Sequence, residues 1–261
     1  MTSISLHNVT KQFGNGFHAL RGVTADFTPG TLTAIIGPSG AGKSTMIRMI
    51  NGLEFPTNGQ VKVEDRVVNR SNLKEIRGDV GIIFQHYNLV SRLAVMTNTL
   101  TGRLKHRSWL GSMLYLFRKN DMDLAFQALD RVGLLDRAWD RADRLSGGQQ
   151  QRVGIARALA QAPRILLADE PVASLDPVTS EEIMQILREI CDRDGITVIV
   201  NLHQVDLARR FASRVIGLNA GKIVFDGHPD ALDQSTLDRI YHNHTEKEIR
   251  NEIPAPMLAD A

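Results

Sequence analysis

The stretch GPSGAGKST, residues 37–45, decides the fold, because it matches the pattern G-x-x-x-x-G-K-[ST] in a suitable context. The residues before it, Thr31–Ile36, form a short apolar, β-branched run, which predicts a buried strand. The residues after it, Lys43–Asn51, have apolar side chains at helical spacing, which predicts a helix. A glycine-rich loop that follows a strand and precedes a helix is the arrangement of a phosphate-binding loop. The sequence therefore predicts an α/β fold organised around a phosphate-binding loop.

The residue types of this loop suit a nucleoside triphosphate. Glycines allow backbone angles closed to other residues and let the chain wrap closely around an anion. Backbone N–H groups and the helix N-terminus then face the β-phosphate, Lys43 adds a mobile positive charge, and Ser44 offers a hydroxyl to Mg²⁺. A glycine turn that contains Lys-Ser by chance is the alternative. The predicted nucleotide-binding residues here are Gly37, Pro38, Ser39, Gly40, Ala41, Gly42, Lys43, Ser44 and Thr45.

The composition describes an ordinary globular protein. The chain has 261 residues, of which 43% are hydrophobic and 23% charged, and this length suffices for one large domain or a domain with an inserted lobe. The net charge of +2 indicates no overall bias toward nucleic acid. Cys191 is the single cysteine, so we expect no intrachain disulfide and a reducing compartment. The sequence shows no secretory signal, and no apolar run approaches the roughly 20 residues that span a bilayer.

Two later strands are expected to end in residues that carry chemistry. The run Arg164–Ala168 ends in Asp169 and Glu170, and Ile196–Val200 leads to His203. Ligands of α/β sheets bind at the carboxyl ends of parallel strands. There Asp169 can hold Mg²⁺, Glu170 can polarise a water for attack on the γ-phosphate, and His203 can contact that phosphate. A solvated acidic turn and an ordinary polar histidine are the alternatives.

The remaining pattern predicts further strands, helices and a helical lobe. Helical periodicity extends over Thr97–Val132, and Cys191 lies on the apolar face of a predicted helix, which indicates a core thiol. The apolar segment Trp109–Phe117 fits either core packing or a surface that contacts a partner or a membrane. The other predicted strands are Ser3–Thr10, Val23–Thr28, Gln60–Val63, Val67–Val68, Val80–Phe84, Arg214–Leu218 and Lys222–Phe225, and the other helices are Arg152–Gln161, Thr179–Asp192 and Gln204–Phe211.

Two residues or motifs outside the strands also point to a nucleotide. Ser146, Gly147 and Gly148 precede a predicted helix, so their backbone offers a second anion-binding N-terminus. Phe13 lies in a polar loop, where an aromatic ring can stack on a purine or fold back onto the core.

Taken together, these motifs resemble the ATPase subunits of ABC transporters. The resemblance covers Ile4–Gly227 and depends on the phosphate loop, a strand-end Gln85, the sequence Leu-Ser-Gly-Gly-Gln at residues 145–149, the pair Asp169-Glu170, and His203. It implies a P-loop NTPase fold with a RecA-like core, an antiparallel β subdomain and an inserted α-helical subdomain. The implied domain is residues 1–245, with the core at 1–85 and 162–245, the helical lobe at about 86–161, and a polar, flexible tail at 246–261.

The resemblance also implies roles for single residues. Two copies would pair head to tail and enclose two ATP molecules with Mg²⁺, and the implied catalytic residues are Glu170 as the general base, His203 at the γ-phosphate and Gln85 near the metal ion and the attacking water. Phe13 would stack on adenine, and Ser44, Gln85 and Asp169 would serve the metal ion. Ser146, Gly147, Gly148 and Gln149 would close over the γ-phosphate of the other copy, and Asp176 would communicate across the dimer.

A narrower similarity joins the chain to the ATPase subunits of phosphonate importers. It rests on the segments His86–Leu93, Ala168–Pro177 and Val200–Ala208. Many other ABC ATPases have Thr or Ser before this histidine and Asp after it, whereas Asn201 and Gln204 stand at related places here. The implied cargo is a phosphonate or a related oxyanion such as phosphite.

This similarity implies a set of partners and a location. The implied partners are a second copy, two transmembrane permease subunits and, indirectly, a periplasmic phosphonate-binding protein, with no nucleic acid. The implied location is the cytoplasmic face of the bacterial inner membrane, and Tyr87–Leu93 is a candidate contact with the permease. Amino acids, methionine or lipoprotein release are the rival transport functions. A soluble ABC ATPase acting on nucleic acid lacks support because the chain has one cassette, and a nucleotide kinase would not explain Leu-Ser-Gly-Gly-Gln.

Overall fold

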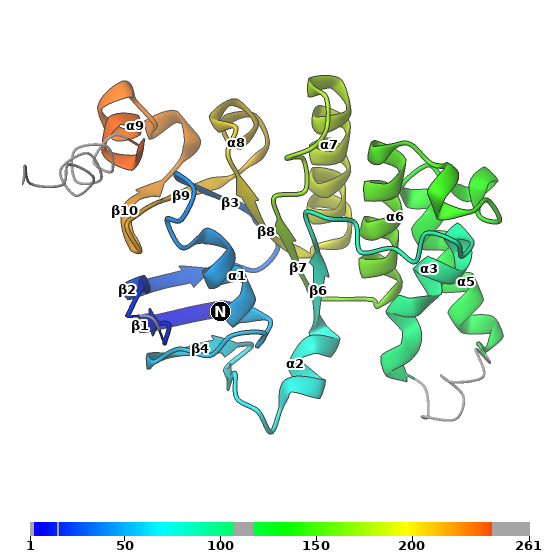
Figure 1. Ribbon diagram of the computed structural model, residues 1–261, viewed down its shortest axis with the longest axis horizontal. Coiled ribbons are helices and arrows are strands. Elements are labelled where there is room, and N and C mark those ends of the chain that lie inside the picture. The colour runs from blue at the N-terminus through cyan, green and yellow to red at the C-terminus, as the bar shows by residue number, and fades with distance from the viewer. Residues whose placement is uncertain (1–2, 15, 107–116, 242–261) are drawn as a thin grey trace, which may run out of the picture.

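The computed structural model describes residues 3–14, 16–106 and 117–241, which form two β-sheets and the helices packed on them (Figure 1). The smaller sheet is antiparallel in the order β2-β1-β4-β5. Its strands are β1 (Ile4–Gln12), β2 (His18–Phe27), β4 (Asn58–Val63) and β5 (Arg66–Val67). Strands β1 and β2 extend beyond the sequence prediction, because their pairing continues to Gln12 and His18.

The larger sheet carries the strands that precede the predicted chemistry. Its order is β10-β9-β3-β8-β7-β6, parallel from β9 to β6, with β10 antiparallel at one edge. Parallel strands present their carboxyl ends at the same edge, so the segments that follow β3, β7 and β8 come together. The strands are β3 (Leu32–Ile36), β6 (Val80–Ile83), β7 (Ile165–Asp169), β8 (Thr197–Leu202), β9 (Arg214–Asn219) and β10 (Lys222–Gly227).

Each face of the larger sheet lies in a different core. In β7, Ile165 and Leu167 face the smaller sheet and α1 (Lys43–Ile50), whereas Leu166 and Ala168 face the helices on the other side. This alternation follows from the two-residue period of a strand, and it explains the continuous apolar runs of the sequence. Helix α1 packs between the two sheets (Figure 1). The remaining helices are α2 (Leu73–Asp79), α3 (Val95–Leu100), α5 (Lys119–Arg131), α6 (Gly147–Ala160), α7 (Pro177–Asp194), α8 (Val205–Phe211) and α9 (Gln234–Tyr241).

The helical region differs in part from the sequence prediction. Helix α3 ends at Leu100 and continues as a 3-10 helix over Thr101–His106, and α5 covers Lys119–Arg131, so the described residues of the predicted helical region Thr97–Val132 are largely helical but do not form one α-helix. Side chains cause part of this change, because the Thr99 and Thr101 hydroxyls hydrogen-bond backbone carbonyls of the preceding turn. Gly102 lets this segment lie against α6, since a Cβ there would be 2.1 Å from the Arg157 carbonyl oxygen.

The structure confirms the predicted burial of Cys191 and adds a helix that the sequence did not predict. Cys191 is buried in the core, as predicted, and burial raises the pKa of its thiol. Helix α2 was not predicted, because its seven residues carry only two large apolar side chains, Leu73 and Ile76. Of the predicted apolar segment Trp109–Phe117, all residues except Phe117 lie outside the described residues, and so does the tail after Tyr241.

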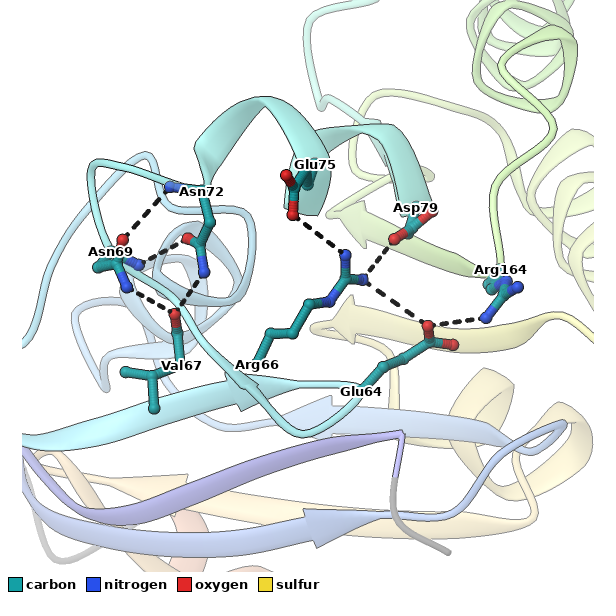
Figure 2. A network of polar contacts seen from close by, with 8 residues as sticks. All are labelled: Glu64, Arg66, Val67, Asn69, Asn72, Glu75, Asp79 and Arg164. Carbon is teal, nitrogen blue, oxygen red and sulfur yellow. Dashed lines mark hydrogen bonds and ion pairs between the residues drawn. The ribbon is translucent and has the colours of Figure 1, made fainter.

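Charged residues fasten the smaller sheet to the larger one (Figure 2). The β4–β5 turn consists of Glu64 and Asp65, both with positive φ, as a two-residue type I′ hairpin requires. Glu64 accepts a hydrogen bond of 2.9 Å from Arg164, which directly precedes β7, and Arg66 pairs with Asp79 at the end of α2. These ion pairs connect segments that are up to 100 residues apart in the chain. They hold the turn at the amino ends of the parallel strands, on the side opposite to the phosphate loop.

Candidate functional site

The predicted phosphate loop joins β3 to α1 and requires glycine at two of its positions. Gly37 has a φ of 151°, and a Cβ there would lie 2.1 Å from the Leu218 carbonyl oxygen. Gly42 has a φ of 105°, and its Cβ would lie 2.4 Å from the Ala19 carbonyl oxygen. Backbone of β9 and β2 therefore approaches the loop so closely that any side chain would have to displace it. The neighbouring strands thus help to set the loop's shape.

Lys43 is buried at the centre of this loop, with 4% of its surface exposed. Its Nζ donates to the carbonyl oxygens of Gly37 at 2.8 Å and Pro38 at 3.1 Å. Burial lowers the pKa of Lys43, while the nearby carboxylates of Glu170 and Asp169 act to raise it. The loop, Phe17, Ala19 and Glu170 line a pocket of about 190 Å³. A cation beside such a pocket suits an anionic ligand.

The predicted metal residues Ser44 and Asp169 are in contact. The Ser44 hydroxyl on α1 donates to Asp169 Oδ1 at the end of β7, at 2.7 Å. Asn201 on β8 donates to the same oxygen at 2.8 Å. A hydroxyl and a carboxylate fit Mg²⁺, which prefers hard oxygen ligands and often takes only one or two from the protein beside substrate phosphates. The described part of the chain contains no cluster of three or more His, Cys, Asp or Glu residues that could hold a metal ion.

Glu170 and His203, predicted as base and phosphate contact, hydrogen-bond each other. Glu170 Oε1 lies 2.7 Å from His203 Nε2. Glu170 has a φ of 53°, an uncommon backbone conformation for a residue other than glycine, and such strain is concentrated at functional sites. Its side chain is 18% exposed and that of His203 is 40% exposed, so both can reach a ligand at the strand ends. The sequence located both residues at this edge but did not predict their contact.

The aromatic residue at the phosphate loop was only partly anticipated. Phe13, predicted to stack on adenine, has the Lys11 ammonium 4.9 Å from its ring centroid. The Phe13 N–H donates to the carbonyl of Phe17, and it is Phe17 that lines the pocket, with 52% of its surface exposed. Sequence reasoning missed Phe17, although its place in the same polar loop was a usable signal. Phe13 and Phe17 therefore belong to one turn, of which Phe17 lines the pocket.

Gln85 lines a different cleft from that of the phosphate loop. This cleft has a volume of about 510 Å³ and includes Gln85, Tyr87, Ser91, Gln150 and Ser174. The structure thus does not place Gln85 in the pocket that contains Lys43 and Glu170. The segment after Gln85 is attached to α6, because the Arg157 guanidinium donates to the carbonyls of Tyr87 and Asn88 at 3.0 and 2.5 Å. Burial lowers the pKa of Arg157.

The second predicted anion site lies at the N-terminus of α6. Ser146 is the N-cap, and a capping box joins it to Gln149 in both directions at 3.0 and 3.3 Å. A Cβ at Gly147 would lie 2.8 Å from the Tyr87 hydroxyl, and one at Gly148 would lie 2.3 Å from Thr179 Cγ2, so a larger residue at either position would have to displace that side chain. Asp176 caps α7, and bonds from the Thr179 side chain and N–H lower its pKa. Within the described residues, neither cap lines the phosphate-loop pocket.

Arg157 and Asn201 are the other residues of interest that the motifs did not assign a role. Arg157 lies in the middle of α6 without a local signal, since its carbonyl partners are about 70 residues away. Asn201 could have been found as a polar residue at the end of an otherwise apolar strand. Its partner across the sheet is Asp169.

The chain is similar in sequence to known ATP-binding proteins of transporters. A family described as "ABC transporter" matches residues 20–173 of the chain. The phosphonates import ATP-binding protein of Thiobacillus denitrificans is 62% identical over 92% of this chain and 93% of its own length. A protein of the same name from Trichodesmium erythraeum is 56% identical over 92% and 94%.

Solved structures agree in fold. A dimeric ATP-binding cassette in a post-hydrolysis state, bound to ADP and Pi, matches with a TM-score of 0.75 at 36% identity, over 87% of this chain and 98% of that one. A nucleotide-free cassette of an ABC transporter matches with a TM-score of 0.78 at 27% identity, over 97% and 100%. These findings confirm the fold class and the resemblance inferred from the motifs. The chain belongs to the ABC transporter family, among its ATP-binding subunits.

Proposed function

We propose that this protein is the ATP-hydrolysing subunit of an ABC importer for phosphonates or related phosphorus oxyanions such as phosphite. The observation that carries the ATPase role is the joint placement of Lys43, the Ser44–Asp169 pair and the Glu170–His203 pair at one sheet edge. The cargo class is supported by the 62% identity to a phosphonates import protein over nearly the whole chain. The contacts of the site itself carry no information about cargo.

In the proposed mechanism, the phosphate loop binds ATP through its backbone and through Lys43. The ammonium already faces two loop carbonyls, and phosphate oxygens offer it stronger, charge-assisted partners at the same place. Phe13 stacks on the adenine. Phe17, which shares its turn, lines the entrance. Binding of phosphate also relieves the unfavourable burial of the Lys43 charge, because it supplies the opposite charge.

Hydrolysis then depends on the strand-end residues. Ser44 and Asp169 would hold Mg²⁺, with Gln85 approaching it, and the ion would neutralise charge on the β- and γ-phosphates. Glu170 accepts a proton from the attacking water. His203 fixes the orientation of the Glu170 carboxylate and is near enough to that base to contact the γ-phosphate as well.

The second half of each site comes from another copy of the chain. Ser146, Gly147, Gly148 and Gln149 offer a capped helix N-terminus, which suits the γ-phosphate of a partner in a symmetric dimer. Asp176 at the start of α7 would communicate across that dimer. This proposal keeps residues 1–245 as one ATPase domain, with a core at 1–85 and 162–245, a helical lobe at about 86–161, and a tail at 246–261.

The dimer would attach to two membrane permease subunits at the cytoplasmic face of the bacterial inner membrane. The segment Tyr87–Leu93 is the proposed contact, because it follows Gln85 and Arg157 ties it to α6. The segment Trp109–Phe117 is a second candidate. Across residues 3–14, 16–106 and 117–241, the structure contains no helix that is long and apolar enough to cross a bilayer. A periplasmic phosphonate-binding protein would act indirectly, and no nucleic acid is involved.

The test is ATPase activity in nanodiscs that contain this chain and the permease subunits encoded beside it. The binding protein is added with and without 2-aminoethylphosphonate, and a Glu170→Gln complex is the control. We expect stimulation only with the binding protein and phosphonate together, and none in the control. Stimulation by the binding protein that ignores phosphonates would discard the cargo class and keep the importer. Failure to associate with any permease would remove the importer role.

A further inference from the structure

Asn201 is a buried amide directly beside Asp169. The two residues are partners in the register of the parallel strands β7 and β8. Asn201 has no exposed surface, and its Nδ2 donates to Asp169 Oδ1 at 2.8 Å. The side-chain carbonyl of the same residue, Oδ1, is buried and has no hydrogen-bond partner in the described part of the chain. Half of this amide is therefore used and half is not.

An apolar residue would suit this position better for stability alone. Ile199 on β8 and Leu167 on β7 lie two residues before Asn201 and Asp169 and therefore face the same side of the sheet. The partner of Asn201 on β3 is Ile35, which is also apolar. A buried carbonyl without a partner loses its hydrogen bond to water and gains nothing in return. The unpaired carbonyl of Asn201 therefore lowers the stability of the fold. The interaction that Asn201 does make is its hydrogen bond to Asp169.

The bond to Asp169 has a particular geometry. Asn201 and Ser44 both donate to Oδ1, which leaves Oδ2 without a hydrogen bond from the described residues. A hydroxyl that ligates Mg²⁺ through a lone pair can still donate its proton, so Ser44 would keep its bond to Oδ1. Asn201 is the other donor on that oxygen. Because it is buried in a central strand, it cannot swing away as a loop side chain would.

We propose that Asn201 is a positioning residue that holds the Asp169 carboxylate in one orientation for Mg²⁺·ATP. This rests on the proposed function, in which Ser44 and Asp169 serve the metal ion. Asn201 keeps Oδ1 occupied, so Oδ2 faces the metal and its waters. Residues that orient a metal ligand in this way are typically worth about 10-fold to 100-fold in metal affinity.

The test compares nucleotide binding with and without Mg²⁺ in purified Asn201→Leu, by calorimetry with ADP in MgCl₂ and in EDTA. We expect the Mg²⁺-dependent gain in ADP affinity to fall by about 10-fold to 100-fold, with affinity in EDTA within about two-fold of the parent chain. The melting temperature should stay equal or rise, because the unpaired carbonyl is gone. If Asn201→Leu does not fold, Asn201→Ala, which only removes atoms, carries the same test.

Thr33→Val is the matched control. Thr33 is also buried in the larger sheet, its hydroxyl also lacks a hydrogen-bond partner among the described residues, and its strand alternation places it on the same face as Ile35. The control should keep the full Mg²⁺ dependence. Loss of ADP affinity equally in MgCl₂ and EDTA, or a lower melting temperature with unchanged Mg²⁺ dependence, would assign Asn201 a purely structural role and overturn the inference. A parent chain that binds no nucleotide would instead refute the proposed function and the inference with it.

Discussion

The phosphate loop and the N-terminus of α6 are both predicted phosphate sites, but they differ in how much of each is built by one chain. At the phosphate loop, contacts converge from three strands, and the Ser44–Asp169 bond spans 125 residues. At the N-terminus of α6, the capping bonds of Ser146 and Gln149 span three residues. Long-range contacts therefore form the first site within a single chain, whereas the second is a local motif that is shaped and capped in advance.

This difference teaches where the missing half of the chemistry must come from. The N-terminus of α6 is capped by Ser146, and the free N–H groups of a helix N-terminus suit an anion. In the proposed division, this terminus belongs to the helical lobe and the phosphate loop to the core. The proposed symmetric dimer would bring each such terminus to the other copy's loop. The predictions below test this division of labour.

The largest effect should be on the rate of ATP hydrolysis, from a change of Glu170 beside the phosphate loop. Glu170→Gln removes the proposed base while keeping its shape, and loss of a general base typically costs about 10²–10⁴ in rate, or roughly 3–5 kcal/mol of barrier. ATP binding should persist, so the variant should accumulate as an ATP-bound dimer. Phosphate release and gel filtration with ATP would measure both. If Glu170→Gln hydrolysed ATP at the rate of the parent chain, Glu170 would not be the general base.

Lys43 should have the next largest effect, on affinity. Lys43→Ala removes charge-assisted bonds worth about 1.5–3 kcal/mol, which is roughly 10-fold to 150-fold in ATP affinity. Burial lowers the pKa of this lysine from 10.5, so ATP affinity in the parent chain should fall with rising pH earlier than for an exposed lysine. Lys43→Arg keeps its charge over that range and serves as the control. Titration calorimetry across pH would measure this, and equal affinity of Lys43→Ala and the parent would contradict the assignment.

The sequence predicted most of the phosphate-loop region because the signals there are local. Glycine spacing, Lys43 and Ser44 lie within nine residues, and buried parallel strands read as continuous apolar runs that end where the chemistry begins. The Glu170–His203 bond was not predicted, because strand order is not written in any local pattern. Gln85 is a similar case. The sequence motif identifies this residue, but it does not predict which cleft the residue lines.

The helical lobe was harder to predict because its contacts override local preference. The Thr99 hydroxyl hydrogen-bonds a carbonyl of the preceding turn near the end of α3, and Gly102 and Arg157 make contacts with residues far away in sequence. Helix α2 carries too few apolar residues for periodicity to reveal it. The roles of Phe13 and of the Ser146 motif stay predictions from resemblance, since their partners are a nucleotide and a second chain.

Mixing two impaired variants, at an ATP concentration too low to fill the Lys43→Ala site, would sharpen the comparison directly. Lys43→Ala breaks the phosphate loop of its own chain, and Ser146→Arg blocks the α6 N-terminus with bulk. In a mixed dimer one site contains both defects and the other contains neither, because the halves come from different chains. About a quarter of parental ATPase should return, since half of the dimers are mixed and each has one of two sites intact. If mixing restores nothing while mixed dimers form, each site belongs to one chain and the dimer proposal is wrong.

A smaller effect should follow from removing the α6 cap. Ser146→Ala loses the bond to the Gln149 N–H, and N-cap loss typically costs about 1 kcal/mol of stability. For a chain of this size this corresponds to a melting temperature about 2–4 °C lower. Ser39→Ala, an exposed serine of the phosphate loop, is the control and should leave the melting temperature unchanged. An unchanged melting temperature in Ser146→Ala would show that the terminus is held by its neighbours instead of its cap.

The smallest effect concerns the cap of α7. Hydrogen bonds from Thr179 lower the pKa of Asp176, so its carboxylate binds fewer protons in the folded chain than in the unfolded one. Its contribution is fully present above the unfolded value of about 3.9 and is lost as the pH falls through the folded value. Asp176→Asn still caps the helix but has no charge to lose, so it should be slightly less stable than the parent at neutral pH, and the gap should close in acid. Urea unfolding at neutral pH and below about pH 3.9 would measure that gap. A gap that stays constant with pH would show that the charge of Asp176 does not contribute to the stability of the single chain, and it would contradict this prediction.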